Sequence, residues 1–187
     1  MHRKLRAALV GGVLGVAASL ASAAVLTFDD IGAEGTVPAA YGGLDWSAAG
    51  WTAFNTEQDP YNAHSGSWRA ATGWGADDAA SLIRFPTPAT FQGAWMAGLG
   101  GATVSFQLFA GGQLVASSAT LDASATPTFL ASGYAGMVDA VQVHSPAHAY
   151  FAMDDFSFTA SVPEPQSVLL MALGLVLVGG LARARRS

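Results

Sequence analysis

Thr103-Val104-Ser105-Phe106-Gln107-Leu108-Phe109 is the stretch that decides the fold class of this chain. Its apolar residues Val104, Phe106 and Leu108 alternate with polar ones, which is the pattern of a half-buried antiparallel strand. Ala110-Gly111-Gly112-Gln113 follows and predicts a tight turn, because two adjacent glycines suit the backbone of a hairpin. We expect residues 114–121 to return as the second strand.

Short apolar runs separated by Gly, Pro and Asp continue through residues 24–160, and none keeps the three-and-four spacing of a helix. The region has no cysteine, so its stability has to come from packing, for which Trp and Phe provide bulky side chains. The chain is all-β by this reading, with one β-sandwich of jelly-roll type at residues 24–160. The further strands that we expect are residues 25–28, 44–47, 51–54, 81–85, 91–97, 127–131, 138–144 and 150–159.

Charge is distributed unevenly along the 187 residues, of which 51% are hydrophobic and 11% are charged. Residues 24–160 hold two arginines, no lysine and twelve acidic residues, so their formal charge is −10. Nucleic-acid binding needs clustered Lys and Arg, and so does attachment to anionic lipid. The composition therefore excludes nucleic acid as a partner of this region.

The N-terminus has the layout of a secretory signal peptide over residues 1–23. Three basic residues precede an uncharged apolar run at residues 7–20, and small side chains follow at Ala21, Ala23 and Ala24. Cleavage is expected between Ala23 and Ala24. The alternative is an uncleaved anchor, but the apolar run is shorter than the ~20 residues that a spanning helix usually needs.

The C-terminus combines three features over residues 161–187. Val162-Pro163-Glu164-Pro165 is followed by an apolar, uncharged stretch at residues 167–182 and by a basic tail at residues 183–187 that contains Arg183, Arg185 and Arg186. Positive charge stays in the cytoplasm, so a transmembrane helix over residues 167–182 leaves residues 24–160 outside. A buried core helix is the alternative, although little chain follows that could cover it.

This tripartite tail resembles the PEP-CTERM sorting signal of exopolysaccharide-producing Gram-negative bacteria. The resemblance implies an exosortase as partner, a transient stay in the inner membrane, and cleavage near residues 163–165. Thr27-Phe28-Asp29-Asp30 and residues 41–46 are similar to the opening of PEP-CTERM ectodomains. More loosely, the strand spacing after Gly101 looks like that of galactose-binding-like carbohydrate modules.

Two aspartate pairs, one near each end of the domain, are candidate ligands for calcium. The terminal strands of a jelly roll often run side by side, and clustered carboxylates without basic neighbours favour a hard cation. Alternation along a strand predicts that only one member of each pair points inward, and turn-capping or edge aspartates are the alternative. The four residues are Asp29, Asp30, Asp154 and Asp155.

Aromatic side chains gather within a loop-rich segment, where most are expected in the core and one or two on the surface, able to stack on sugar rings. They are Trp46, Trp51, Tyr61, Trp68 and Trp74. The histidines give little support for an enzyme. Pro146 separates His144 from His148, and His64 lacks the strand-turn-helix context of a nucleophile elbow.

These observations predict a non-enzymatic protein of the envelope or extracellular matrix. It is exported, processed at its tail, and in contact with exopolysaccharide, with calcium as an optional cofactor. A small secreted hydrolase that acts on matrix polysaccharide is one alternative. A purely structural surface subunit is the other.

Overall fold

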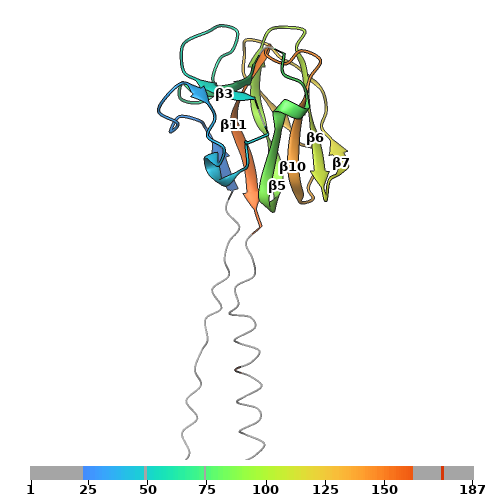
Figure 1. Cartoon of the computed structure of the whole chain (residues 1–187). Helices are drawn as coiled ribbons and strands as arrows, with labels where there is room; N and C mark the ends of the chain where they lie inside the picture. The colour runs from blue at the N-terminus through green and yellow to red at the C-terminus, as the bar shows by residue number, and fades with distance from the viewer. Residues whose placement is uncertain (1–22, 49, 74, 162–173, 175–187) are drawn as a thin grey trace, which may run out of the picture. The chain divides into compact units, whose positions relative to one another are not determined.

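Antiparallel strands make up nearly all regular structure in the computed structural model, which describes residues 23–48, 50–73, 75–161 and 174 (Figure 1). The all-β prediction is confirmed. The strands pair in the order β2-β3-β4-β11-β5-β10-β6-β7, with β1 against β11, β9 against β5 and β8 against β6. The elements are β1 (Ala23–Leu26), β2 (Gly35–Thr36), η1 (Tyr41–Gly43), β3 (Trp51–Phe54), β4 (Arg69–Thr72), η2 (Ala79–Ser81), β5 (Leu82–Gly98), β6 (Thr103–Ala110), β7 (Gln113–Ser117), β8 (Leu121–Asp122), β9 (Thr128–Ala131), β10 (Val138–His144) and β11 (Phe151–Ala160).

The predicted hairpin is formed by β6 and β7. The side chains of Val104, Phe106 and Leu108 are fully buried, as their alternation indicates. Gly111 and Gly112 have φ angles of 58° and 74°, which two-residue hairpin turns of the I′ type require at both central positions. The return strand is shorter than predicted, because the chain leaves β6 after Ser117 and rejoins it as β8.

The central strand β5 corrects the prediction of two strands at residues 81–85 and 91–97. It runs without interruption for 17 residues, through Pro86 and Pro88. Arg84 pairs with β10, whereas the residues from Ala89 onward pair with β11. The prolines therefore lie where the strand exchanges one partner for another, and a missing N–H is least costly there.

Two further segments differ from the prediction. Residues 44–47 form no strand, and only Asp45 bridges to Arg84. Strand β4 was not predicted, because Ala70 and Ala71 at its centre give a weak apolar signal. It is held instead by pairing with β3 on one edge and β11 on the other.

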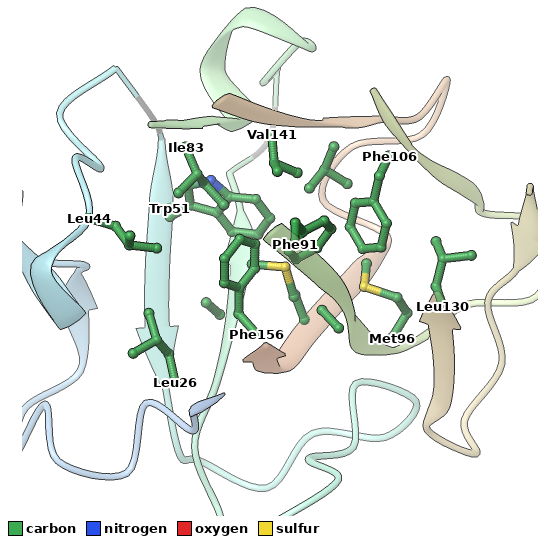
Figure 2. Close-up of a cluster of buried hydrophobic side chains, with 14 of the residues drawn as sticks. Leu26, Leu44, Trp51, Ile83, Phe91, Met96, Phe106, Leu130, Val141 and Phe156 are labelled. Atoms are coloured by element: carbon green, nitrogen blue, oxygen red, sulfur yellow. The ribbon is translucent and has the colours of Figure 1, made fainter. Parts of the chain in front are cut away.

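The hydrophobic core is built around aromatic rings from distant parts of the chain (Figure 2). The ring of Phe91 lies between those of Phe106 and Phe156, with centroid distances of 4.9 and 4.6 Å. Trp46 and Trp51 are buried beside them, as predicted. Because β5 joins all these strands into one hydrogen-bonded sheet, the jelly-roll sandwich stays a prediction.

The first and last strands of the domain pair with each other. Ala23 and Ala24 of β1 lie opposite Thr159 and Phe158 of β11. Within the described residues, no helix has the length and apolar character needed to cross a membrane. The predicted signal peptide (through residue 22, including Ala21), the sorting motif and the basic tail lie outside the described residues. The same holds for the predicted transmembrane helix, except that Gly174 is helical.

Candidate functional site

The loop that joins β3 to β4, residues 55–68, is held by charged side chains from four other places in the chain. We call it the anchored loop. Its sequence is rich in Asn, Gln, Asp, Ser and Gly, which form no strand of their own here. Loops of this kind carry function when a rigid scaffold positions them, so the anchors decide what the loop is able to do.

The first anchor is Arg69, the first residue of β4, which is only 3% exposed. Its guanidinium donates hydrogen bonds to the backbone carbonyls of Thr56 (2.7 Å), Tyr61 (2.6 Å) and Ser67 (3.0 Å). It also lies 4.1 Å from the centre of the Phe54 ring. Burial lowers the pKa of Arg69, but a guanidinium stays charged, and its bonds along the loop offset the cost of desolvation.

The second anchor is the pair Asp154 and Asp155 of β11, which are 2% and 7% exposed. One oxygen of Asp154 accepts the backbone N–H groups of His64 (2.8 Å) and Ser65 (2.9 Å). Asp155 accepts the hydroxyl of Ser65 at 2.7 Å, and its other oxygen lies 2.6 Å from Nδ1 of His64. Two successive carboxylates therefore hold two successive loop residues.

Both aspartates are buried because β11 is irregular at this point. The register against β5 shifts between Asp154 and Ser157, and Asp155 has a φ of 48°. A bulge of this kind places neighbouring side chains out of strict alternation. The prediction that only one of these two side chains points inward is wrong for this reason.

Burial, together with the charge of the neighbouring Asp155, raises the pKa of Asp154 to about 6 against the lowering effect of the backbone N–H donors. An acid with such a pKa is suited to proton transfer when a substrate reaches it. Asp154 is covered by the anchored loop and accepts three backbone N–H groups, including that of Asp155. Its present partners therefore give it a structural role in holding the loop.

Two acidic residues near the N-terminus complete the anchoring. One oxygen of Asp29 accepts the backbone N–H groups of Ser67 (3.1 Å) and Trp68 (3.2 Å). One oxygen of Glu34 accepts those of Asn55 (2.9 Å) and Thr56 (2.6 Å), and hydrogen bonds from Thr56 and Asn55 lower the pKa of Glu34. The loop is thus fixed at its beginning, its middle and its end.

The four aspartates proposed as calcium ligands do not converge. Asp30 accepts the hydroxyl of Tyr41 at 2.6 Å, and the other three bind the anchored loop. Among the residues that the structure describes, no group of three or more His, Asp or Glu side chains is arranged to hold a metal ion. Calcium binding at these positions stays a prediction, without a ligand group to support it.

Two shallow hollows lie on the anchored loop, and Gln58 lines both. One, of about 260 Å³, also contains the rings of Phe54 and Tyr61. The other, of about 390 Å³, is lined mainly by polar residues, among them Asn55 and Asn62. The combination of aromatic rings with amide groups is suited to a hydroxyl-rich ligand, because the rings cover apolar ring faces and the amides both donate and accept hydrogen bonds.

Of the aromatic residues singled out from the sequence, Trp46, Trp51 and Trp68 are in the core and Tyr61 lies half-buried in a hollow. Trp74 lies outside the described residues. Sequence reasoning missed the pair of His64 and Trp95, whose rings stack with centroids 3.4 Å apart and planes 10° apart. Helix and strand periodicity relates only residues that are close in the chain, so it could not pair His64 with Trp95.

The other two histidines of the described residues meet at one carboxylate. Nδ1 of His144 lies 2.5 Å from one oxygen of Asp78, and Nε2 of His148 lies 2.8 Å from the other. Although burial raises the pKa of Asp78, these hydrogen bonds leave it lowered. Pro146 does separate the two histidines along the chain, but the turn between β10 and β11 brings them back to the same partner.

Comparison with known proteins identifies the tail. Residues 161–186 match the PEP-CTERM protein-sorting motif, which confirms the resemblance seen in the sequence. No curated protein and no solved structure matches the chain. The likeness to galactose-binding-like modules therefore stays a prediction. By its tail, the chain is an exported protein with a PEP-CTERM sorting motif and a substrate of an exosortase.

Proposed function

We propose that the mature protein is a non-enzymatic component of the cell envelope or extracellular matrix, and that it contacts exopolysaccharide through the anchored loop. The sorting motif supports the location, because it directs an exported protein through exosortase processing. The anchoring of residues 55–68 supports the contact. This anchoring is the observation on which the proposal chiefly rests.

A loop that is ordered before it binds loses less conformational entropy on binding, so weak contacts with a polymer suffice. Here one arginine and three acidic side chains hold the backbone of the anchored loop, Asp155 holds the side chains of His64 and Ser65, and two hollows remain open on the loop. Tyr61 and Phe54 provide ring faces, while Gln58 and Asn62 provide amides.

The charge around the loop favours a neutral polysaccharide over an acidic one. Arg69 is the only arginine or lysine in or next to the loop, and its guanidinium is buried and bonded to carbonyls. Glu57 and Asp59 are exposed on the loop itself. An acidic polymer meets repulsion from these carboxylates and finds no free cation here.

The burial of Asp154 and Asp155 favours the non-enzymatic alternative. A glycoside hydrolase needs two accessible carboxyl groups on either side of the scissile bond. These two acids lie beneath the loop and hold it. A hydrolase remains the second candidate function, and one that uses these two acids requires the loop to open.

We further propose that the sheet forms a β-sandwich and that a helix over residues 167–182 tethers the precursor in the inner membrane. The sandwich is supported by contacts between the two ends of β5 and other strands. Phe85 stacks on Phe156 at 6.2 Å, and Phe91 meets Phe106 edge to face at 4.9 Å.

The membrane tether of the precursor is supported by the sorting motif and by the arginines that follow the apolar stretch.

Calorimetric titration of the full-length chain in a polyoxyethylene detergent, with neutral and acidic polysaccharides, tests the contact. We expect binding of a neutral polymer that Tyr61→Ala and Gln58→Ala each weaken about tenfold. Gln113→Ala, a matched change on β7, is expected to leave it unaltered. Absence of binding to every polymer supports a structural subunit, and release of oligosaccharides supports a hydrolase.

Replacing Pro163 and Pro165 together tests the sorting step. Proline holds the chain extended and non-helical, as a protease substrate requires. The doubly substituted precursor is expected to stay membrane-bound and uncleaved in cells that contain an exosortase. Unchanged release into the medium contradicts this role of the motif.

A further inference from the structure

A second surface cavity of the described domain lies away from the anchored loop, on the face of β5, β10 and β6 that points away from the core. It has a volume of about 770 Å³, and we call it the groove. Arg84, Ala140 and Phe109 lie opposite one another on the three neighbouring strands. Directly opposed residues share one face of a sheet, so these side chains form a row across the floor of the groove.

The groove holds the only solvent-exposed arginine among the described residues. Residues 24–160 contain two arginines, and Arg69 is buried and bonded to three carbonyls. The other, Arg84, has a side chain that is 46% exposed and lies 3.9 Å from Asp45, which is 40% exposed. This is a loose surface pair of little energetic value, so both groups are free to bind a ligand.

Acidic groups nevertheless outnumber the basic one in the groove. Asp45 stays ionised, because hydrogen bonds from Ser47 lower its pKa. Asp139 uses one carboxylate oxygen to accept the backbone N–H of Gly111. Two carboxylates and one guanidinium line the cavity, which gives a formal charge of −1 within a region of charge −10.

The net negative charge of the groove therefore indicates which class of ligand it favours. An acidic sugar adds a negative charge to a site that already has an excess, and the field of the whole domain repels it. A neutral sugar donates hydroxyl groups to the second carboxylate but leaves the net charge of the groove uncompensated. A ligand with one positive charge neutralises the groove and is attracted by the rest of the domain.

We propose that the groove binds a hexosamine unit with a free ammonium group. The ring of Phe109 and the exposed Pro86 offer apolar surface to a face of the sugar. Arg84 and Gln142 are suited to hydrogen bonds with its hydroxyl groups, and Asp45 and Asp139 to the ammonium. The groove and the anchored loop have no lining residue in common, so this inference stands apart from the proposed function.

Calorimetric titration of the full-length chain with three tetrasaccharides tests the proposal, at low and at physiological salt. The probes are tetraglucosamine, tetra-N-acetylglucosamine and tetragalacturonate. We expect tetraglucosamine to bind at least tenfold more tightly than the other two. The double variant Asp45→Asn, Asp139→Asn is expected to lose about tenfold, since both amides retain an acceptor for the existing hydrogen bonds but lose the charge.

Two control variants separate the groove from other sites. Asp122→Asn changes an exposed aspartate that accepts the N–H of Gly101, and it is expected to bind tetraglucosamine as the unaltered chain does. Tyr61→Ala alters the anchored loop and is also expected to keep this binding. A loss in either variant contradicts the assignment to the groove.

Three further results overturn the proposal. The first is equal affinity for the acetylated tetramer, which shows that the ammonium is not recognised. The second is unchanged binding by the double variant, which shows general attraction to an acidic surface. The third is equally tight, groove-dependent binding of pentalysine, which assigns the groove to a basic protein partner instead of a sugar.

Discussion

Asp154 accepts the backbone N–H of His64 at 2.8 Å, although 90 residues separate the two in the chain. The bond connects the last strand of the domain, which leads into the sorting motif, with the loop on which the proposed polysaccharide contact rests. Burial raises the pKa of this carboxyl group to about 6 from its usual 3.8. The stability of the domain therefore depends on the protonation of one buried acid.

We predict that Asp154 makes the domain more stable at acidic pH. The folded state binds this proton more tightly than the unfolded state does. The contribution is therefore complete below about pH 3.8 and is lost as the pH rises through about 6. It amounts to at most about 3 kcal/mol. Urea unfolding of the full-length chain in detergent, followed by tryptophan fluorescence at several pH values, measures it.

Asp154→Asn removes this titration while keeping an acceptor oxygen for the loop. The difference in unfolding free energy between the unaltered chain and the variant is expected to change across pH 4 to 7, with the unaltered chain losing stability as the pH rises. Asp122→Asn serves as the exposed control. A constant difference over this range contradicts the prediction.

Arg69→Lys is expected to destabilise the protein by about 3 kcal/mol, because a lysine ammonium cannot reproduce the fork of donors that reaches three carbonyls. The anchored loop loses its central restraint, so limited proteolysis is expected to cut within residues 55–68. The matched change Arg84→Lys affects an exposed, loosely paired residue and should leave both readouts nearly unaltered. Equal proteolysis of the two variants argues against this role of Arg69.

Gly93→Ala is expected to lower the unfolding free energy by about 2 kcal/mol or more. Gly93 has a φ of 145°, which side chains rarely allow, and an added Cβ meets the backbone carbonyl oxygen of Leu130 on β9. Gly100→Ala is the control, because nothing lies within 4 Å of an added Cβ there. If the two variants unfold at the same urea concentration, the close approach of β9 to β5 is not as described.

Phe106→Ala is expected to cost about 3 to 5 kcal/mol, since it removes a fully buried ring that packs against Phe91. Its neighbour Gln107 points to the opposite, partly exposed face of β6. Gln107→Ala should therefore change the unfolding free energy by no more than about 0.5 kcal/mol. Similar losses in both variants contradict the assignment of the two faces.

Local patterns predicted much of the fold. The alternation around Phe106 and the glycine pair at Gly111 gave the correct hairpin, and β3 and β10 lie at the predicted residues. The pattern failed at Pro86, because prolines normally end a strand but are tolerated where β5 changes partner. It also failed at β4, whose alanines carry no periodic signal.

The candidate site was harder to predict, because its members come from separate strands. Asp29, Asp30, Asp154 and Asp155 were predicted as a group, and in the structure all of them except Asp30 share the anchored loop as their hydrogen-bond partner. The bulge at Asp155 reversed the expected alternation, and nothing in the residue types around it signals a bulge. No pattern in the sequence indicates the role of Arg69, because its three carbonyl partners come together only when the loop has folded.

The sequence by itself determined the all-β class, the acidic character of the domain and the sorting motif at residues 161–186, because composition, alternation and a contiguous motif are properties of neighbouring residues. Only the tertiary structure decided that buried charges hold the anchored loop and that Arg84 lines a groove together with two aspartates. Both arrangements depend on strand pairing between residues tens of positions apart. The free energy of such pairing is set by the whole sheet and not by any one segment.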